Sequence, residues 1–198
     1  TMCNGHKGMV HYVLNWQAWL LQNGWKKPKT FLVFIGKQDL GKNLMWEELF
    51  INGILGEKLG HVVQDMKRFQ SNFNMQRLGR SLHLFNECTC IQSNNKTNWD
   101  MIKSLSDRTF TAEPKGKESF TAEDCGGYVF LSNHAMPVLV ENDDRRYACT
   151  DMNPKHKNKK PYWDKLAAAV ADPRIQRAYF TRLIERDVAK WNMRTIPD

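Results

Sequence analysis

The stretch FLVFIGKQDLGKNLMWEELF, residues 31–50, has the pattern of a phosphate-binding loop set between a buried strand and a helix. Residues 31–35 are aromatic and branched apolar residues without alternation, which is typical of a strand buried on both faces. From residue 44 onward the apolar residues return to helical spacing. The loop between them fits G-x-x-x-x-G-K, and its residues are Gly36, Lys37, Gln38, Asp39, Leu40, Gly41, Lys42 and Asn43.

Glycines at both ends of such a loop let the backbone wrap a phosphate, and Lys42 would reach the β- and γ-phosphates of a nucleotide. Composition alone produces the pattern about once in twenty chains of this size, so a purely structural loop is the alternative. The flanking strand and helix supply the context that the motif requires. Asn43 stands where such loops carry Ser or Thr, and its carboxamide oxygen can still face Mg²⁺. The sequence therefore predicts that residues 36–43 bind ATP, with Asn43 as a Mg²⁺ ligand.

Two further apolar runs, SLHLFNE at 81–87 and GYVFLSN at 127–133, repeat the buried-strand signal and end in polar residues. Three buried strands interleaved with helices predict an α/β sheet. Asn86 stands where P-loop ATPases usually carry an Asp that helps to hold Mg²⁺, so it is a second expected metal position. Glu87 is the expected general base that polarises the attacking water, although a surface carboxylate after a core strand is the alternative. Asn133 is expected to hydrogen-bond the γ-phosphate or the attacking water.

A hairpin is predicted between these two runs, where the segments Thr109–Glu113 and Ser119–Ala122 flank the turn PKGK. Lys115 and Lys117 would lie at its tip. There they could contact DNA, or they could only protect an exposed strand edge, for which Lys is common.

The paired arginines Arg145 and Arg146 follow the third apolar run. Arginine is always protonated and can donate two parallel hydrogen bonds, so it is well suited to stabilise charge on a transferring phosphoryl group. A pair of this kind can equally be a solvated part of a loop.

The formal net charge of +8 over 198 residues favours an anionic partner such as nucleic acid, with a merely basic protein as the alternative. No segment approaches the roughly 18 to 20 apolar residues of a membrane span, so no membrane partner is expected. Five scattered cysteines lack zinc-site spacing, which favours reduced thiols in an intracellular compartment. His61, His83 and His134 are expected to be structural, and the basic run KHKNKK at 155–160 to be a solvated loop.

The order of strand, P-loop, strand with an acidic end, basic hairpin, strand with Asn and paired Arg resembles the superfamily 3 helicases of the AAA+ class. The resemblance is closer to the primase-helicase proteins of phages, large viruses and mobile elements. It covers nearly the whole chain, and the matching segments are GKQDLGKN, FNE, MIKSLSDRTFTAEPKGKESF, FLSNHAMP, DDRRY and VAKWNMRTIP.

The resemblance implies an AAA+ P-loop ATPase core whose hairpin grips single-stranded DNA in the channel of a homo-oligomeric ring, expected to be a hexamer. It makes Lys103, Lys115 and Lys117 DNA contacts, lets Arg145 and Arg146 reach a neighbour's ATP, and places a primase-polymerase domain upstream. The departures at Asn43 and Asn86 put catalytic rate and metal affinity in doubt. The expected organisation is an N-terminal helical segment at 1–28, the ATPase core at 29–153, a basic loop at 154–161 and a C-terminal helical tail at 162–198. By propensity and period the tail is expected to be helical from Tyr162 to Trp191, with a break near Asp172 and Pro173.

Three functions remain open from the sequence. The first is a ring helicase or translocase domain that couples ATP hydrolysis to movement on single-stranded DNA in replication. The second is an ATP-dependent oligomerisation or DNA-loading module with weak hydrolysis. The third is a small-molecule P-loop kinase, which is disfavoured because no acceptor-binding lid is evident.

Overall fold

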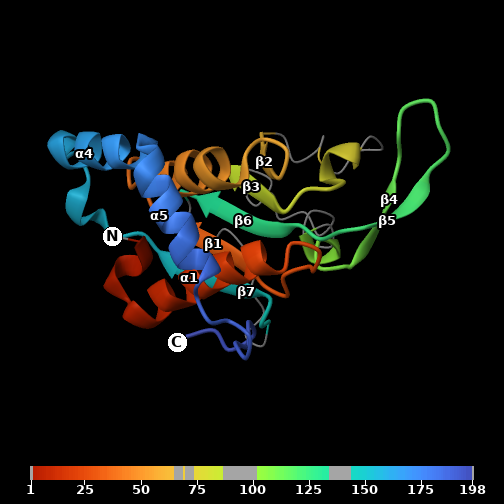
Figure 1. Cartoon of the computed structure of the whole chain (residues 1–198), viewed down its shortest axis with the longest axis horizontal. Coiled ribbons are helices and arrows are strands. Elements are labelled where there is room, and N and C mark those ends of the chain that lie inside the picture. The colour runs from red at the N-terminus through yellow and green to blue at the C-terminus, as the bar shows by residue number, and fades with distance from the viewer. Residues whose placement is uncertain (1, 65–68, 70–73, 87–101, 134–143, 198) are drawn as a thin grey trace.

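The computed structural model describes residues 2–64, 69, 74–86, 102–133 and 144–197 of the chain. A parallel five-stranded sheet crosses the middle of the molecule in the order β2-β3-β6-β1-β7 (Figure 1). The fold is therefore the predicted α/β class, with a parallel sheet flanked by helices. The strands are β1 (Phe31–Ile35), β2 (Gly60–Val63), β3 (Leu82–Asn86), β6 (Gly127–Ser132) and β7 (Tyr147–Asp151).

Helices cover one face of the sheet and bury the first hydrophobic core. Leu32 and Phe34 of β1 point into this core, where they meet Trp16 of α1 and Trp46 of η2. Helices α4 and α5 pack on η2, and α5 also packs on α1 (Figure 1). The helices are α1 (Lys7–Gln22), η2 (Leu44–Leu55), α4 (Lys160–Ala171) and α5 (Pro173–Ile184), with short 3-10 turns η1 (Met2–Gly5), η3 (Asn74–Arg77) and η5 (Pro154–His156).

A second hydrophobic core lies on the opposite face of the sheet. Phe31 and Val33, which alternate with the residues of the first core, pack there with Phe85 and Phe130. The rings of Phe85 and Phe130 stack with centroids 4.8 Å apart. Because successive side chains of β1 enter opposite cores, the strand is buried on both faces, as its unbroken apolar run predicts.

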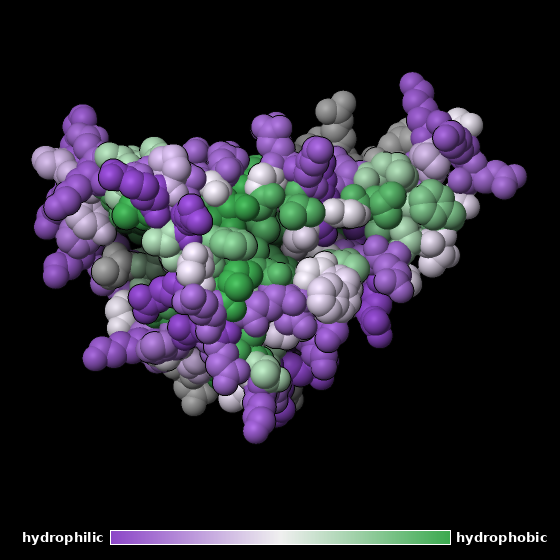
Figure 2. All heavy atoms as spheres, viewed as in Figure 1, coloured by the Kyte–Doolittle hydropathy of each residue, from purple (hydrophilic) through white to green (hydrophobic). Residues whose placement is uncertain are grey.

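The predicted hairpin is present as β4 (Thr109–Ala112) and β5 (Phe120–Glu123), paired antiparallel. It projects well away from the sheet (Figure 1). Phe110, Ala112 and Ala122 form a small apolar cluster at its base, and Figure 2 shows hydrophilic residues gathered at its far end.

A buried ionic cluster joins the base of the hairpin to the sheet. The carboxylate of Asp124, whose side chain is fully buried, accepts hydrogen bonds from Lys27 (2.6 Å), Arg77 (2.8 Å) and the hydroxyl of Tyr128 (2.5 Å). Burial by itself raises the pKa of Asp124, but the Lys27 charge and these hydrogen bonds outweigh it and lower the pKa below its usual value. The cluster fixes the position from which the hairpin leaves the core.

Two strands and one helix end differ from the sequence expectation. The short strands β2 and β7 were not predicted, and both extend the sheet at its edges. The helical tail does break at Asp172, which accepts a hydrogen bond from the backbone N–H of Arg174 and caps α5, with Pro173 in its first turn. The tail was also expected to stay helical as far as Trp191, which is wrong, because α5 ends at Ile184.

No helix in the described part of the chain is long and apolar enough to cross a membrane.

Candidate nucleotide-binding site

A cavity of about 620 Å³ lies at the carboxyl end of the central strands. The P-loop supplies one wall with residues 38–43, and Asn86 and Asn133 enter from the ends of β3 and β6. Because parallel strands end at the same edge of a sheet, segments far apart in sequence meet here. The volume is within the range of small-molecule sites.

Both glycines of the P-loop are required by close packing. A Cβ on Gly36 would lie 2.8 Å from Cβ of Met152, the residue that follows β7. A Cβ on Gly41 would clash with Cζ3 of Trp163 and lie 2.7 Å from its Cη2. Gly41 and Asp39 also have positive φ angles of 79° and 65°, as a loop that curls around a ligand requires. The backbone N–H of Gly36 donates to the carbonyl of Ser132 over 3.0 Å, which ties the loop to the end of β6.

The ammonium of Lys42 is held in the centre of this loop. Its side chain is nearly buried, at 8% exposed. Nζ donates hydrogen bonds to the carbonyls of Gly36 (2.5 Å) and Lys37 (2.9 Å) and to Oδ1 of Asn133 (2.9 Å). A fixed cation beside the N-terminus of η2 is an arrangement that attracts phosphate oxygens.

Three predicted site residues with amide side chains line the same cavity. Asn43 is exposed at the start of η2, while Asn86 and Asn133 are half-buried where β3 and β6 end. The structure therefore brings together the two expected metal positions and the residue expected to contact the γ-phosphate. Carboxamide oxygens are hard ligands that suit Mg²⁺, so Asn43 and Asn86 fit the ion, although each is neutral. Glu87, the expected base, lies outside the described residues, and its role stays a prediction.

The paired arginines lie at the amino end of the strands, whereas the cavity lies at their carboxyl end. The carbonyl of Arg146 accepts a hydrogen bond of 2.6 Å from the N–H of Phe31, where β1 begins. A five-residue strand separates this end from the P-loop, a span of about 16 Å. Arg146 forms a two-point ion pair with Asp144 (Nε–Oδ1 2.7 Å, Nη2–Oδ2 2.5 Å). Hydrogen bonding from Arg146 lowers the pKa of Asp144 and keeps its carboxylate charged.

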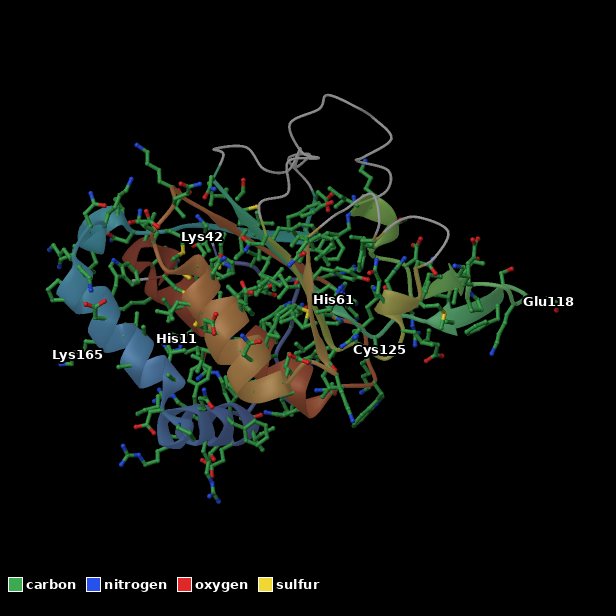
Figure 3. The ribbon with its side chains drawn as sticks, turned by 90° about the horizontal axis from the view of Figure 1, so that it is seen from above. His11, Lys42, His61, Glu118, Cys125 and Lys165 are labelled. Carbon is green, nitrogen blue, oxygen red and sulfur yellow. The ribbon has the colours of Figure 1, made fainter. Side chains whose placement is uncertain are left out.

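The expected DNA-contact lysines occupy two places. Lys115 and Lys117 are exposed at the hairpin turn, which the N–H of Lys117 closes on the carbonyl of Pro114. Figure 3 shows Glu118 of the same turn at the far end of the molecule from Lys42. Lys103 is half-buried and close enough to Asp144 for its charge to lower the pKa of that carboxyl. Lys103 therefore lies on the side of the molecule where Asp144 is, and it is not part of the hairpin turn.

The sequence interpretation missed five cavity residues. Leu44 and Leu131 belong to elements that it had placed, whereas Asn158, Lys160 and Trp163 come from a part of the chain to which it assigned no site. They follow η5, in and just after the basic run that was expected to be only a solvated loop. Asn158 and Lys160 are both exposed, as a solvated loop predicts, but they also line the cavity. The adjacent aromatic pair Tyr162-Trp163 was the available signal, since large aromatic side chains are more often placed in packed surfaces than in solvated loops.

Comparison with known proteins agrees with this fold. A DNA primase-polymerase of Nitratiruptor phage NrS-1 is 24% identical over 147 residues, which are 71% of this chain and 19% of that protein. Two apo structures of the NrS-1 C-terminal region, both 19% identical, cover 94% of this chain with TM-scores of 0.75 and 0.76, and the match takes up 44% and 43% of their chains. The chain thus spans less than half of the solved NrS-1 region and about a fifth of the phage protein.

These matches confirm the predicted resemblance to a phage primase-polymerase protein and the predicted α/β fold with a parallel sheet flanked by helices. Residues 34–146, more than half of the chain, match the Family of unknown function (DUF5906). The matched segment runs from β1 through the P-loop, the hairpin and β6 to the arginine pair. The chain belongs to this family.

Proposed function

We propose that this chain is the ATP-hydrolysing domain of a ring-shaped DNA helicase or translocase in a phage-type or virus-type replication protein. The observation that carries the proposal is the position of Lys42, whose ammonium joins the P-loop carbonyls to Asn133 at the end of the neighbouring strand. From this position the ammonium can contact a phosphate bound in the loop. It also contacts Asn133, which is proposed to lie next to the γ-phosphate. The name of the NrS-1 relative, a DNA primase-polymerase, supports a role in DNA replication and an upstream primase-polymerase domain.

In this function ATP lies with its β- and γ-phosphates against the P-loop backbone and Lys42. Asn43 and Asn86 would hold Mg²⁺, which would supply positive charge next to the phosphate oxygens. Asn133 hydrogen-bonds the γ-phosphate or the attacking water, and Glu87 takes a proton from that water.

The arginines act in a neighbouring subunit. Arg145 and Arg146 lie at the amino end of the strands, far from the cavity of their own chain. In this proposal a second copy of the chain places its arginines at that cavity. This arrangement supports a homo-oligomer, proposed as a hexameric ring. Lys115 and Lys117 on the projecting hairpin are then available to contact single-stranded DNA inside the ring, away from the nucleotide.

A second candidate function is an ATP-dependent oligomerisation or DNA-loading module with little hydrolysis. The observation that favours it is the pair of neutral amides, Asn43 and Asn86, at both proposed metal positions. An amide attracts Mg²⁺ less strongly than a carboxylate does, because it carries no net charge.

ATP turnover by the full-length protein, with and without single-stranded DNA, distinguishes the two functions. A motor hydrolyses ATP faster when DNA is present. A loading module binds ATP and hydrolyses it at a negligible rate in both conditions. Protein that binds no ATP, in an assay that detects binding to an established P-loop ATPase, contradicts both.

A further inference from the structure

The first turn of α4 contributes one aromatic side chain to the wall of the cavity. Trp163 lines the cavity, and its indole N–H donates a hydrogen bond of 2.8 Å to the carbonyl of His156. Tyr162 meets Trp163 edge to face, with ring centroids 5.0 Å apart, and stacks on His156 at 3.9 Å. The indole is thus held from two sides by its own segment.

The benzo edge of the same indole lies against the Cα of Gly41. The ring therefore stands next to the residue that precedes Lys42, at the side of the phosphate-binding loop. Its only hydrogen-bonding group is already used by His156, so the ring can offer a ligand in the cavity only its flat apolar surface. Leu44 and Leu131 add further apolar surface to the cavity.

The cavity consequently has two chemically different parts. Lys42 and the loop backbone suit phosphate, and the indole suits a flat, uncharged aromatic group. A nucleoside triphosphate carries both chemistries on one molecule.

We propose that Trp163 stacks on the base of the bound nucleotide and makes the site prefer a nucleoside triphosphate over inorganic triphosphate. The inference rests on the proposed function and adds to it the residue that recognises the base. It also assigns a role to α4, which brings the ring onto the P-loop from outside the segment 36–43.

The test compares ATP with inorganic tripolyphosphate, which has the phosphates but no base. Affinities are measured by calorimetry on the full-length protein. Stacking of a base on an aromatic side chain is worth roughly 1 to 3 kcal/mol. Trp163→Ala should therefore weaken ATP binding about tenfold and leave tripolyphosphate binding within a factor of two. Trp163→Phe, which retains a ring, should recover most of the loss.

Trp25→Ala is the matched control. Trp25 is 70% exposed, and its carbonyl accepts from the thiol of Cys125, which Figure 3 shows well away from Lys42. Its removal should change neither affinity.

Fluorescence provides a second measurement that does not depend on the alanine variant folding. ATP should quench the emission of the wild type, tripolyphosphate should not, and most of the quenching should be missing in Trp163→Phe. An unchanged ratio of the ATP and tripolyphosphate affinities in Trp163→Ala, or undiminished quenching in Trp163→Phe, overturns the inference while the proposed function stands. Tighter ATP binding by Trp163→Ala also overturns it, because the ring then blocks the cavity. If the wild type binds neither ligand, the proposed function itself fails.

Discussion

Nζ of Lys42 and Oδ1 of Asn133 lie 2.9 Å apart, so a single hydrogen bond connects the P-loop after β1 to the end of β6. The sheet places these strands side by side, with Ile35 opposite Ser132. A phosphate that enters the loop competes with the carbonyls and with Asn133 for the Lys42 ammonium. Phosphate binding in the loop is therefore expected to weaken the hydrogen bond between Lys42 and Asn133 at the end of β6, next to the proposed position of the γ-phosphate.

Lys42→Ala is expected to weaken ATP binding about 10- to 100-fold, because hydrogen bonds to charged groups contribute roughly 1.5 to 3 kcal/mol each. Lys58→Ala is the matched control, since it removes an exposed lysine that lies outside residues 36–43 and does not line the cavity. Calorimetry with ATP measures both, and circular dichroism checks that each variant is folded. Equal affinities in Lys42→Ala and the wild type would remove the claim that residues 36–43 bind a nucleotide.

Asn43→Thr should increase the dependence of ATP binding on Mg²⁺, because it restores the hydroxyl that phosphate-binding loops normally place on the ion at this position. The ratio of ATP affinities with Mg²⁺ and with a chelator should rise about fivefold, which corresponds to roughly 1 kcal/mol. Asn52→Thr changes an exposed asparagine of the same helix and should leave the ratio as it is. No change in Asn43→Thr would place this residue outside the metal shell.

The conformation of the loop at residues 36–43 was predictable because its signal is contiguous. Residues 31–50 contain the strand, the two glycines and the lysine, and all of them lie where the pattern predicts. The cavity wall formed by Trp163 was not predictable in this way, because it exists only after α4 packs on η2. A local pattern does not record such packing.

The sheet shows the same difference between local and tertiary signals. β1 is apolar at every position and is recognisable alone. β7 reads YACTD, and β2 is four residues long and begins with Gly60. Neither run has enough β-branched or aromatic residues to be identified from composition. Each becomes a strand because it pairs with a neighbour that is already in place, β7 with β1 and β2 with β3.

The stability of the fold should fall as the pH drops below about 6.5. His83 is fully buried, with its Nδ1 3.3 Å from Nδ1 of His61. Burial lowers the pKa of His83 well below its usual value, with further lowering from His61, Arg77 and Lys27 and only partial opposition from Asp124. Burial also lowers the pKa of His61. At a pH of about 6 the two histidines therefore bind more protons in the unfolded chain than in the folded chain. The free energy of unfolding consequently decreases as the pH falls.

The magnitude approaches about 1.4 kcal/mol per pH unit for each such histidine once the pH is below the unfolded pKa. Urea unfolding at pH 7.5, 6.5 and 5.5 measures it. His83→Phe should reduce the slope while keeping a ring between Tyr128 and Phe69. His11→Gln, a change at an exposed histidine of α1, should not. A slope that is the same in all three proteins would contradict the assignment.

Lys115→Ala combined with Lys117→Ala is expected to weaken binding of single-stranded DNA to a similar degree for every sequence, because phosphate contacts carry no base information. The slope of log affinity against log salt concentration should flatten by about 0.7 for each DNA phosphate that the variant no longer neutralises. Lys58→Ala with Lys165→Ala removes the same charge at exposed positions away from the hairpin, and Figure 3 shows Lys165 at the opposite end of the molecule. If both double variants change the salt slope equally, the hairpin has no special role in DNA binding.

Arg145 and Arg146 are expected to act across a subunit boundary. Their end of the strands lies about 16 Å from the P-loop of the same chain, as the five-residue β1 requires. An arginine supplied in trans can increase the rate of phosphoryl transfer by roughly 10³ to 10⁵. Arg145→Ala with Arg146→Ala should therefore nearly abolish turnover and change ATP affinity far less, whereas Arg177→Ala with Arg182→Ala, at exposed sites on α5, should stay active.

Mixing two inactive full-length proteins tests this arrangement directly. One carries Lys42→Ala, and the other carries Arg145→Ala with Arg146→Ala. A mixed interface can pair the intact P-loop of the arginine variant with the intact arginines of the lysine variant, so ATP hydrolysis should reappear on mixing. If mixed oligomers form and the mixture stays as inactive as its parents, the arginines do not reach a neighbour's nucleotide, and the ring mechanism no longer has the interaction that makes a single subunit incomplete.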